Sequence, residues 1–359
     1  MSSSGLANSS RLDSLQALRA LAATTVIFDH IPFVRCGAFG VDLFFVLSGF
    51  VMCHISFSDP TYFFAKRIFR IVPLYWTCTL GVALIAILKP GLLVSTSFSG
   101  SALLKSLLFV PFRRPDHSIA PLLFLGWTLQ FEMLFYTIFA ISLKISRRYT
   151  RELVIISLVV LMAVGKIARV IHHSNVILTF YSKFVIMEFA FGILCYTVWV
   201  RYQKVVRQTP ASAAIIAAAL SYLFFILMDI GILGSYGPVL RFLPDFLLRG
   251  MPASIILLAF LSVEQKFRFP ALVLLIGDAS YSLYLLHPYI LESLNRKLFS
   301  LEKFSLTTAL MTAVSIGVCY LCAILSFKLF EHPSNSFLRR YFIPKRVPAT
   351  SFKAANAIG

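Results

Sequence analysis

The sequence predicts an all-α fold, a polytopic membrane helix bundle, from its composition, its apolar runs and the placement of its charges. Hydrophobic residues make up 58% of the 359 positions and charged residues 13%, about half the usual share for a soluble protein. The apolar residues form continuous runs of about 20, the length of a membrane-spanning helix. Because the runs do not alternate with polar residues, β-strands are excluded as the main spanning element.

Ten such spans are expected, separated by short segments richer in polar residues, Gly or Pro. They cover residues 15–33, 38–57, 68–88, 119–142, 152–165, 177–200, 211–230, 251–263, 271–290 and 306–330. The segment from Ser101 to Phe112 is apolar but too short to cross, so it is expected to be re-entrant or interfacial. Residues 231–249 contain three glycines and two prolines and are expected to form a long loop.

The basic residues predict that both termini face the cytoplasm. With the N-terminus inside, the inward segments hold more Lys and Arg than the outward ones, and an even number of spans returns the chain to the inner face. The expected parts are a cytoplasmic segment (1–14), a membrane domain (15–335) and a basic cytoplasmic tail (336–359). The net charge of +18 lies mainly in these topology-setting segments, so no nucleic-acid partner is expected.

No metal site is expected either. The six cysteines are scattered through apolar segments. Cys319 and Cys322 form a C-x-x-C pair, but no second ligand pair accompanies it. His172 and His173 are adjacent, and adjacent residues of a helix do not face one ligand.

Arg19 and His30 lie inside the first predicted span, where ionisable side chains are costly and usually mark a functional site. Over the eleven positions that separate them, a helix turns by about 20° more than three full turns. The two side chains therefore share one helix face, roughly 16 Å apart along the axis. This arrangement suits chemistry on an anionic cofactor. Asp42 enters the next span from the same side, and a His30–Asp42 pair would make a good general base. The alternative is a helix-end histidine bonded to a neighbour.

Two further spans carry charged or polar groups with a functional and a structural interpretation. Arg67 and Arg70 project together at i, i+3 and suit a phosphate or pyrophosphate. The sequence alone favours the structural alternative, an ordinary positive-inside anchor. Glu132 falls near mid-span between Trp127 and Tyr136, whose rings suit a sugar or an acyl-linked group. The structural alternative for Glu132 is an ion pair with a neighbouring span.

A polar stripe marks the ninth predicted span. Tyr281, Tyr284 and His287 follow one another at intervals of three residues, after Asp278 and Ser280. Such a stripe lines a substrate cavity or, alternatively, supplies hydrogen bonds between helices and an aromatic belt near the membrane surface.

The order and spacing of these motifs resemble the acyltransferase family 3 membrane proteins over about residues 11–340. The resemblance rests on Leu15 to Ala23 with His30, Gly40 to Phe50, Arg67 to Arg70, Gly126 to Leu129 with Glu132 and Phe135-Tyr136, and Ser280 to His287. The opening Leu-Gln-Ala-Leu-Arg is most similar to the exopolysaccharide-acetylating branch. The family implies about ten helices and transfer of an acyl group, commonly acetyl from acetyl-CoA, to an extracytoplasmic or lipid-linked carbohydrate.

The resemblance also implies roles for residues. His30 and Arg19 would be essential, and Arg67 and Arg70 would help to bind the cytoplasmic donor. Some family members carry an esterase-like C-terminal domain. This chain ends soon after the tenth span, so it is expected to act alone or with a separate partner.

The expected protein is thus a bacterial inner-membrane O-acetyltransferase, with acetyl-CoA as donor and a polysaccharide or lipid-linked sugar as acceptor. Besides the bilayer, polysaccharide-assembly proteins are candidate partners. The predicted catalytic residues are His30, Arg19, Asp42 and Glu132; the donor-binding residues are Arg67, Arg70 and Arg19; and the acceptor-binding residues are Trp127, Tyr136, Tyr284 and His287. His30 would act as general base or accept the acetyl group transiently.

Two other functions fit the same features. A transporter or flippase of acylated carbohydrate also needs buried charges and a broken span. A non-catalytic scaffold of a polysaccharide assembly complex would leave Arg19 and His30 individually replaceable.

Overall fold

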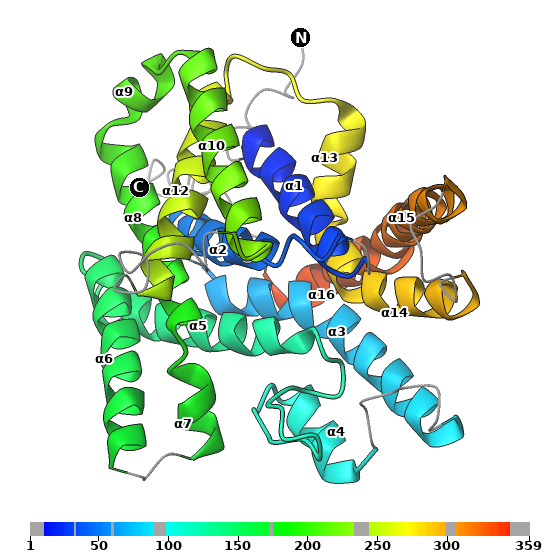
Figure 1. Ribbon diagram of the computed structural model, residues 1–359. Coiled ribbons are helices and arrows are strands. Elements are labelled where there is room, and N and C mark those ends of the chain that lie inside the picture. The colour runs from blue at the N-terminus through cyan, green and yellow to red at the C-terminus, as the bar shows by residue number, and fades with distance from the viewer. Residues whose placement is uncertain are drawn as a thin grey trace, which may run out of the picture.

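The computed structural model of the chain describes residues 11–31, 34–58, 61–89, 98–171, 175–232, 244–298 and 306–344. The regular elements in these ranges are helices, and the β-type contact found there is an isolated bridge between Arg113 and Ile119. The all-α prediction is therefore confirmed for the described part of the chain (Figure 1).

The first half of the chain forms the helices α1 (Asp13–Asp29), α2 (Gly40–Ser58), α3 (Phe63–Leu88), α4 (Gly100–Leu107), α5 (Gly126–Ile145), α6 (Thr150–Val170), α7 (Val176–Tyr181), η2 (Phe184–Ile186) and α8 (Met187–Arg201). The second half forms α9 (Gln203–Gln208), α10 (Ala211–Asp229), α12 (Asp245–Val263), α13 (Ala271–Asp278), α14 (Ser280–Leu298), α15 (Leu306–Ser326), η3 (Phe327–Glu331) and α16 (His332–Phe342).

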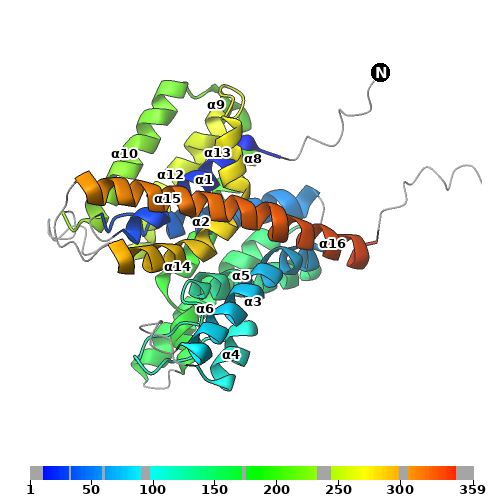
Figure 2. The same ribbon diagram turned by 90° about the vertical axis from the view of Figure 1, so that its right-hand side faces the viewer.

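Seven helical segments in the described ranges are long and apolar enough to cross a membrane, and the bent pair α13 and α14 would make an eighth. Within α2, the apolar segment Gly40–Ser56 falls just short of the length of these spans. The count of ten spans and the cytoplasmic position of both termini remain predictions. The start of α1 and the end of α16 do lie toward the same side of the molecule (Figure 2).

Several predicted boundaries were wrong. The fourth span was expected from residue 119, but α5 begins at Gly126, after a turn-rich segment. Residues 245–249 were assigned to a loop, yet they form the first turns of α12, which follows directly on Pro244. Asp245 in the first turn favours this start, because its carboxylate interacts well with the free N–H groups at a helix N-terminus. Residues 233–243 of the predicted loop lie outside the described residues.

Two predicted spans are interrupted. Residues 177–200 comprise α7, η2 and α8 rather than one helix. The span 271–290 is divided into α13 and α14, which meet at an angle of 75°. At the end of α13, a Cβ on Gly277 would lie 2.1 Å from the carbonyl oxygen of Gln16, so the missing side chain lets α13 pack directly on α1.

The last helical segment is longer than expected. Helices α15, η3 and α16 run without a gap through 37 residues to Phe342, past the predicted end at residue 330 (Figure 2). At about 1.5 Å per residue this exceeds the roughly 30 Å of a hydrocarbon core, so one end projects beyond it. The five-residue π-helix η3 lies where the segment passes α3.

Close backbone contact between α2 and α8 holds the centre of the bundle together. A Cβ on Gly192 would lie 2.0 Å from the carbonyl oxygen of Val46, and one on Gly49 would lie 2.1 Å from that of Phe189. Small residues permit this approach, which brings van der Waals contact that apolar lipid cannot supply. Beside it, the rings of Phe135 and Phe189 stack with centroids 4.1 Å apart, linking α5 to α8.

Replacing Gly192 with Ala is therefore expected to force α2 and α8 apart and to lower the thermal unfolding midpoint in detergent. Overpacking of this kind costs about 1–3 kcal/mol. Gly81→Ala in α3 is the matched control, since nothing lies within 4 Å of its Cβ position. Circular dichroism melts compare the two variants, and equal midpoints would contradict the proposed importance of the α2–α8 contact.

Candidate functional site

Two adjoining cavities contain most of the predicted site residues. One, here called the arginine cavity, is lined by Arg19, Arg67, Arg70 and Glu132, among others. The second, here called the histidine cavity, is lined by residues that include His30, Asp42, Trp127 and Arg249. Val41 and Tyr284 line both cavities, so the two share a wall. The arginine cavity has a volume of about 80 Å³, and the histidine cavity about 610 Å³, which lies within the range of about 300–1,000 Å³ typical of small-molecule sites.

Arg19 is held in place by the break between α13 and α14. Its Nε and one terminal nitrogen donate to Ser280 Oγ at 3.1 and 3.0 Å. Ser280 is fully buried at the first position of α14. In a straight helix through residues 271–290, the Ser280 hydroxyl would have a different direction relative to Arg19. The break in the predicted ninth span therefore positions the guanidinium of Arg19, which lies in the first predicted span.

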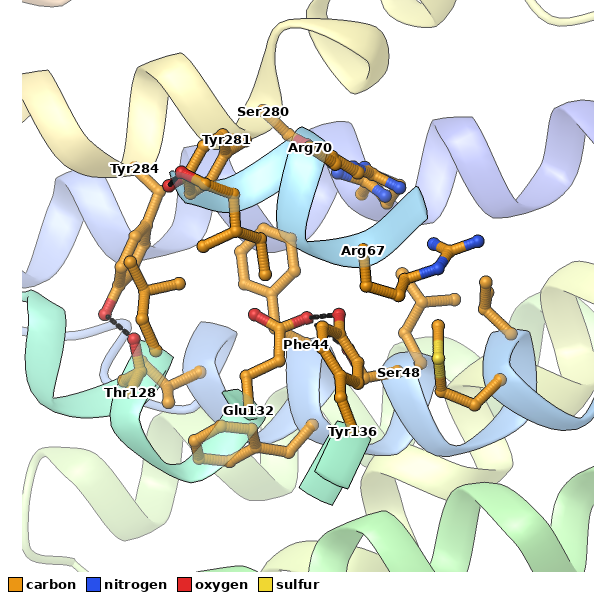
Figure 3. Close-up of a pocket in the computed structure, with 18 residues that line it drawn as sticks. Phe44, Ser48, Arg67, Arg70, Thr128, Glu132, Tyr136, Ser280, Tyr281 and Tyr284 are labelled. Atoms are coloured by element: carbon orange, nitrogen blue, oxygen red, sulfur yellow. Dashed lines mark hydrogen bonds between the residues drawn. The ribbon is translucent and has the colours of Figure 1, made fainter. Parts of the chain in front are cut away.

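Arg67 and Arg70 extend from α3 into the same cavity (Figure 3). Arg67 is only 5% exposed, and its Nε has no hydrogen-bond partner among the described residues. An unpaired donor on a buried cation is costly, because the group gives up water without replacement. Two guanidiniums at i, i+3 with donors to spare suit a bidentate anion such as phosphate. This geometry goes beyond what a surface anchor requires.

Glu132 faces these arginines from α5 (Figure 3). Its Oε1 accepts hydrogen bonds from the Tyr136 hydroxyl and from Ser48 Oγ, the latter at 3.0 Å. In the parts of the chain that the structure describes, no basic side chain pairs with it within 4.0 Å. Among the described residues, Glu132 therefore does not form the ion pair with a neighbouring span that the structural alternative expects. Ser48 is a partner that was not among the predicted site residues.

The predicted polar stripe of α14 contributes to both cavities. The Tyr284 hydroxyl and Thr128 Oγ1 share a hydrogen bond of 2.9 Å, which ties α14 to α5 where the cavities meet (Figure 3). The Tyr281 hydroxyl donates to the carbonyl of Ile71 at 2.7 Å. Tyr281 therefore fixes α14 against α3, as the structural interpretation of the stripe expects, and it also lines the arginine cavity. Tyr284 lines both cavities.

His30 pairs with His287 rather than with a carboxylate. The two rings are edge-to-face with centroids 4.8 Å apart, and His287 Nε2 lies 3.4 Å from His30 Nδ1. Each Nδ1 is also 3.0 Å from the carbonyl four residues earlier, Val26 for His30 and Leu283 for His287. Carbonyls only accept hydrogen bonds, so each Nδ1 carries the proton of the neutral ring. The lone pair of His30 is consequently on Nε2.

The predicted His30–Asp42 pair is not formed. Asp42 Oδ2 accepts a hydrogen bond of 3.0 Å from Arg249 Nη1, and Arg249 also lies 4.0 Å from Asp229. The Asp229 carboxylate in turn accepts from the backbone N–H of Gly37 at 2.9 Å. This network connects α2, α10 and α12, and it gives Asp42 a cationic partner other than the imidazole. Arg249 was missed because its segment was assigned to a loop.

Trp127 and Tyr136 do not share one end of the site, although both were predicted to bind the acceptor. Trp127 lines the histidine cavity, whereas Tyr136 lines the arginine cavity beside Glu132. The nine residues between them advance the chain by about 14 Å along α5. The predicted acceptor set is therefore divided between the two cavities, and His287 is fully buried behind His30.

Arginines and a pair of histidines are brought together at two adjoining cavities inside a bundle of membrane-length helices, which defines the class as a multi-pass helical membrane protein with a polar interior site. The chain belongs to the acyltransferase domain family, whose model matches residues 12–324. The exopolysaccharide production protein ExoZ of Rhizobium meliloti (strain 1021) is 37% identical over 263 residues, which cover 71% of this chain and 77% of that protein. No solved structure matches the chain.

A double-mutant cycle tests the partner of Asp42. Asp42→Asn and Arg249→Gln are each expected to lower the free energy of unfolding in mixed micelles, with a coupling energy of about 0.5–3 kcal/mol between them. The lower half of that range is expected, because the Arg249 side chain is 36% exposed and partly screened by water. Asp42→Asn combined with His30→Asn should be additive. Coupling to His30 instead would contradict the arrangement described.

Proposed function

We propose that the protein is an O-acetyltransferase of the bacterial inner membrane that transfers acetyl, or another small acyl group, from acyl-CoA to a hydroxyl of a cell-surface or lipid-linked polysaccharide. The observation that carries this proposal is the wall shared by the arginine and histidine cavities. An anionic donor held by the arginines would have only this wall, formed by Val41 and Tyr284, to pass in order to reach His30. Membership of the acyltransferase family and the similarity to an exopolysaccharide production protein support the reaction and the acceptor class.

The donor would bind through its phosphates. Arg67 supplies a buried guanidinium and Arg70 a half-buried one, and Arg19 adds a third that Ser280 holds in place. A phosphate or diphosphate would satisfy the unpaired Nε of Arg67 and offset the buried positive charge. The acyl end would then extend past Tyr284 toward His30, over the roughly 16 Å that separate Arg19 and His30 along α1. The narrow arginine cavity suits an extended chain rather than a bulky group.

The chemical step would use the lone pair on His30 Nε2. This nitrogen takes the proton of the acceptor hydroxyl while the hydroxyl oxygen attacks the thioester carbonyl. The carbon–sulfur bond then breaks, and the departing sulfur of CoA receives the proton from His30, so an ester and free CoA result. His287 holds the His30 ring in the required tautomer and orientation. In this scheme it is a positioning residue rather than an acceptor contact.

The acceptor would occupy the larger histidine cavity. Trp127 offers an aromatic face for a sugar, and Tyr284 lies at the junction where the acyl group arrives. Glu132 is associated with the donor side, where its hydrogen bonds to Ser48 and Tyr136 form a polar wall opposite the arginines. Asp42 contributes through Arg249 to the frame of the histidine cavity rather than through His30.

The 75° break between α13 and α14 favours a second candidate, a transporter or flippase of acylated carbohydrate, since broken helices form many transport sites. Purified protein in detergent separates the two functions. An acetyltransferase releases free CoA from acetyl-CoA in the presence of an acceptor glycan, whereas a transporter leaves the thioester intact. Absence of any thioester turnover would refute the proposed function.

His30→Asn is expected to lower polysaccharide acetylation by about 10²- to 10⁴-fold, the usual contribution of a general base. The measurement is the acetate content of the cell's polysaccharide, by mass spectrometry, at equal amounts of inserted protein. His117→Asn is the matched control, because His117 is exposed and lines neither the arginine nor the histidine cavity. Unchanged acetate content in His30→Asn would eliminate the mechanism and favour the scaffold alternative.

Arg67→Gln is expected to weaken acetyl-CoA binding at least about tenfold, because it removes charge-assisted hydrogen bonds to phosphate. Isothermal titration in detergent measures the dissociation constant. Arg147→Gln serves as the control, since Arg147 is an exposed cation between α5 and α6, away from both cavities. Equal affinities for the two variants would count against a donor site at Arg67.

A further inference from the structure

A third cavity adjoins the arginine cavity where α16 passes α3. It is lined by Arg70, Asp278, Glu331, Asn335 and Arg339, among others, and it is called here the C-terminal cavity. Arg70 lines both the arginine cavity and the C-terminal cavity, so the two adjoin at this side chain. A ligand that contacts Arg70 from both cavities would lie between α3 and α16.

The carboxylates of the C-terminal cavity are already engaged. Asp278 pairs with Arg11 at 3.0 Å, and Glu331 accepts a hydrogen bond of 2.6 Å from Ser282. Neither Arg70 nor Arg339 has a carboxylate within 4.0 Å in the described ranges. Their positive charges oppose each other instead. Two like charges that line one cavity and pair directly with neither of its carboxylates favour a bound anion.

Asn335 adds an unsatisfied polar group to the same cavity. Its Oδ1 is shielded from solvent and has no hydrogen-bond partner among the described residues. Buried amide oxygens normally accept a hydrogen bond. An amide oxygen without one, in the same cavity as two guanidiniums that pair with no carboxylate of the described ranges, points to a ligand. A ribose hydroxyl or a purine amino group would donate to it.

The course of the C-terminal helix explains how these residues reach the cavity. The π-helix η3 shifts the register of the α15–α16 segment just before Asn335 and Arg339, and π-turns of this kind often occur at functional sites. Phe342 packs against Phe69 of α3 with ring centroids 5.7 Å apart, next to Arg70 in sequence. All of η3 and α16 lies beyond residue 324, where the match to the family model ends.

Resting on the proposed function, we infer that α16 completes the donor site: Arg339 and Arg70 bind the phosphate groups at the nucleotide end of acyl-CoA in the C-terminal cavity, and Asn335 contacts the nucleoside. The donor would then lie along three cavities in sequence. Its 3′-phosphate would rest at Arg339 and Arg70, its diphosphate at Arg70 and Arg67, and its pantetheine arm would pass Arg19 so that the thioester reaches His30.

The test compares two donors that differ in the nucleotide. Acetyl-CoA carries the phosphates and the nucleoside, and S-acetylpantetheine lacks both. Arg339→Gln is expected to raise the KM for acetyl-CoA about tenfold at unchanged kcat, and to leave the KM for S-acetylpantetheine unchanged. Arg340→Gln is the matched control, since Arg340 is the next residue of the same helix, is exposed and does not line the cavity.

Binding of adenosine 3′,5′-bisphosphate to protein in neutral detergent gives a second readout, independent of turnover. Wild-type protein and Arg340→Gln are expected to show the same thermal stabilisation, and Arg339→Gln to lose it. Stabilisation by phosphatidylglycerol but not by the nucleotide would identify a lipid headgroup site and overturn the inference. If Arg339→Gln does not fold, Arg339→Lys replaces it, with a severalfold rise in KM expected for acetyl-CoA alone.

Two results separate this inference from the proposed function. If wild-type protein turns over acetyl-CoA but Arg339→Gln affects both donors equally or neither, the nucleotide subsite is wrong and the acetyltransferase stands. If wild-type protein neither binds nor turns over either donor, the proposed function itself is refuted.

Discussion

The structure depends on positive charge held inside an apolar helix bundle. Only 5% of the surface of Arg67 is exposed, yet its Nε has no hydrogen-bond partner among the described residues. Arg19 is anchored by a serine hydroxyl, and the nearby Glu132 bonds to hydroxyls. A buried cation with an unsatisfied donor is unfavourable. An anionic ligand in the arginine cavity is the complement that would relieve this cost.

Irregular helices supply the geometry that this cavity needs. The break between α13 and α14 turns Ser280 toward Arg19, and the π-turn of η3 precedes the residues that α16 contributes beside Arg70. Non-helical backbone is tolerated at membrane depth only where protein or a water-filled space satisfies its polar groups. The interruptions and the polar cavities thus support one another, while the uninterrupted α2–α8 contact at Gly49 and Gly192 provides a rigid centre.

The two histidines illustrate how much of the site was predictable. Their presence in apolar runs marked both His30 and His287 as candidates, and the structure brings them within 3.4 Å. Their relation was not foreseen, because His287 was assigned to the acceptor and Asp42 to the orientation of His30. A carboxylate near a histidine in sequence suggests a pair, but Arg249 is a stronger partner for Asp42 since it is always charged.

The sequence by itself determined the helical class, the apolar segments and the ionisable residues within them, because periodicity and the cost of burying charge are local properties. Only the tertiary structure decided which of these residues meet. Asp42 and Arg249 are 207 positions apart, and His30 and His287 are 257 apart. Such contacts follow from helix packing, from glycines that allow backbones to touch and from breaks that redirect side chains. No local pattern encodes the partner across an interface.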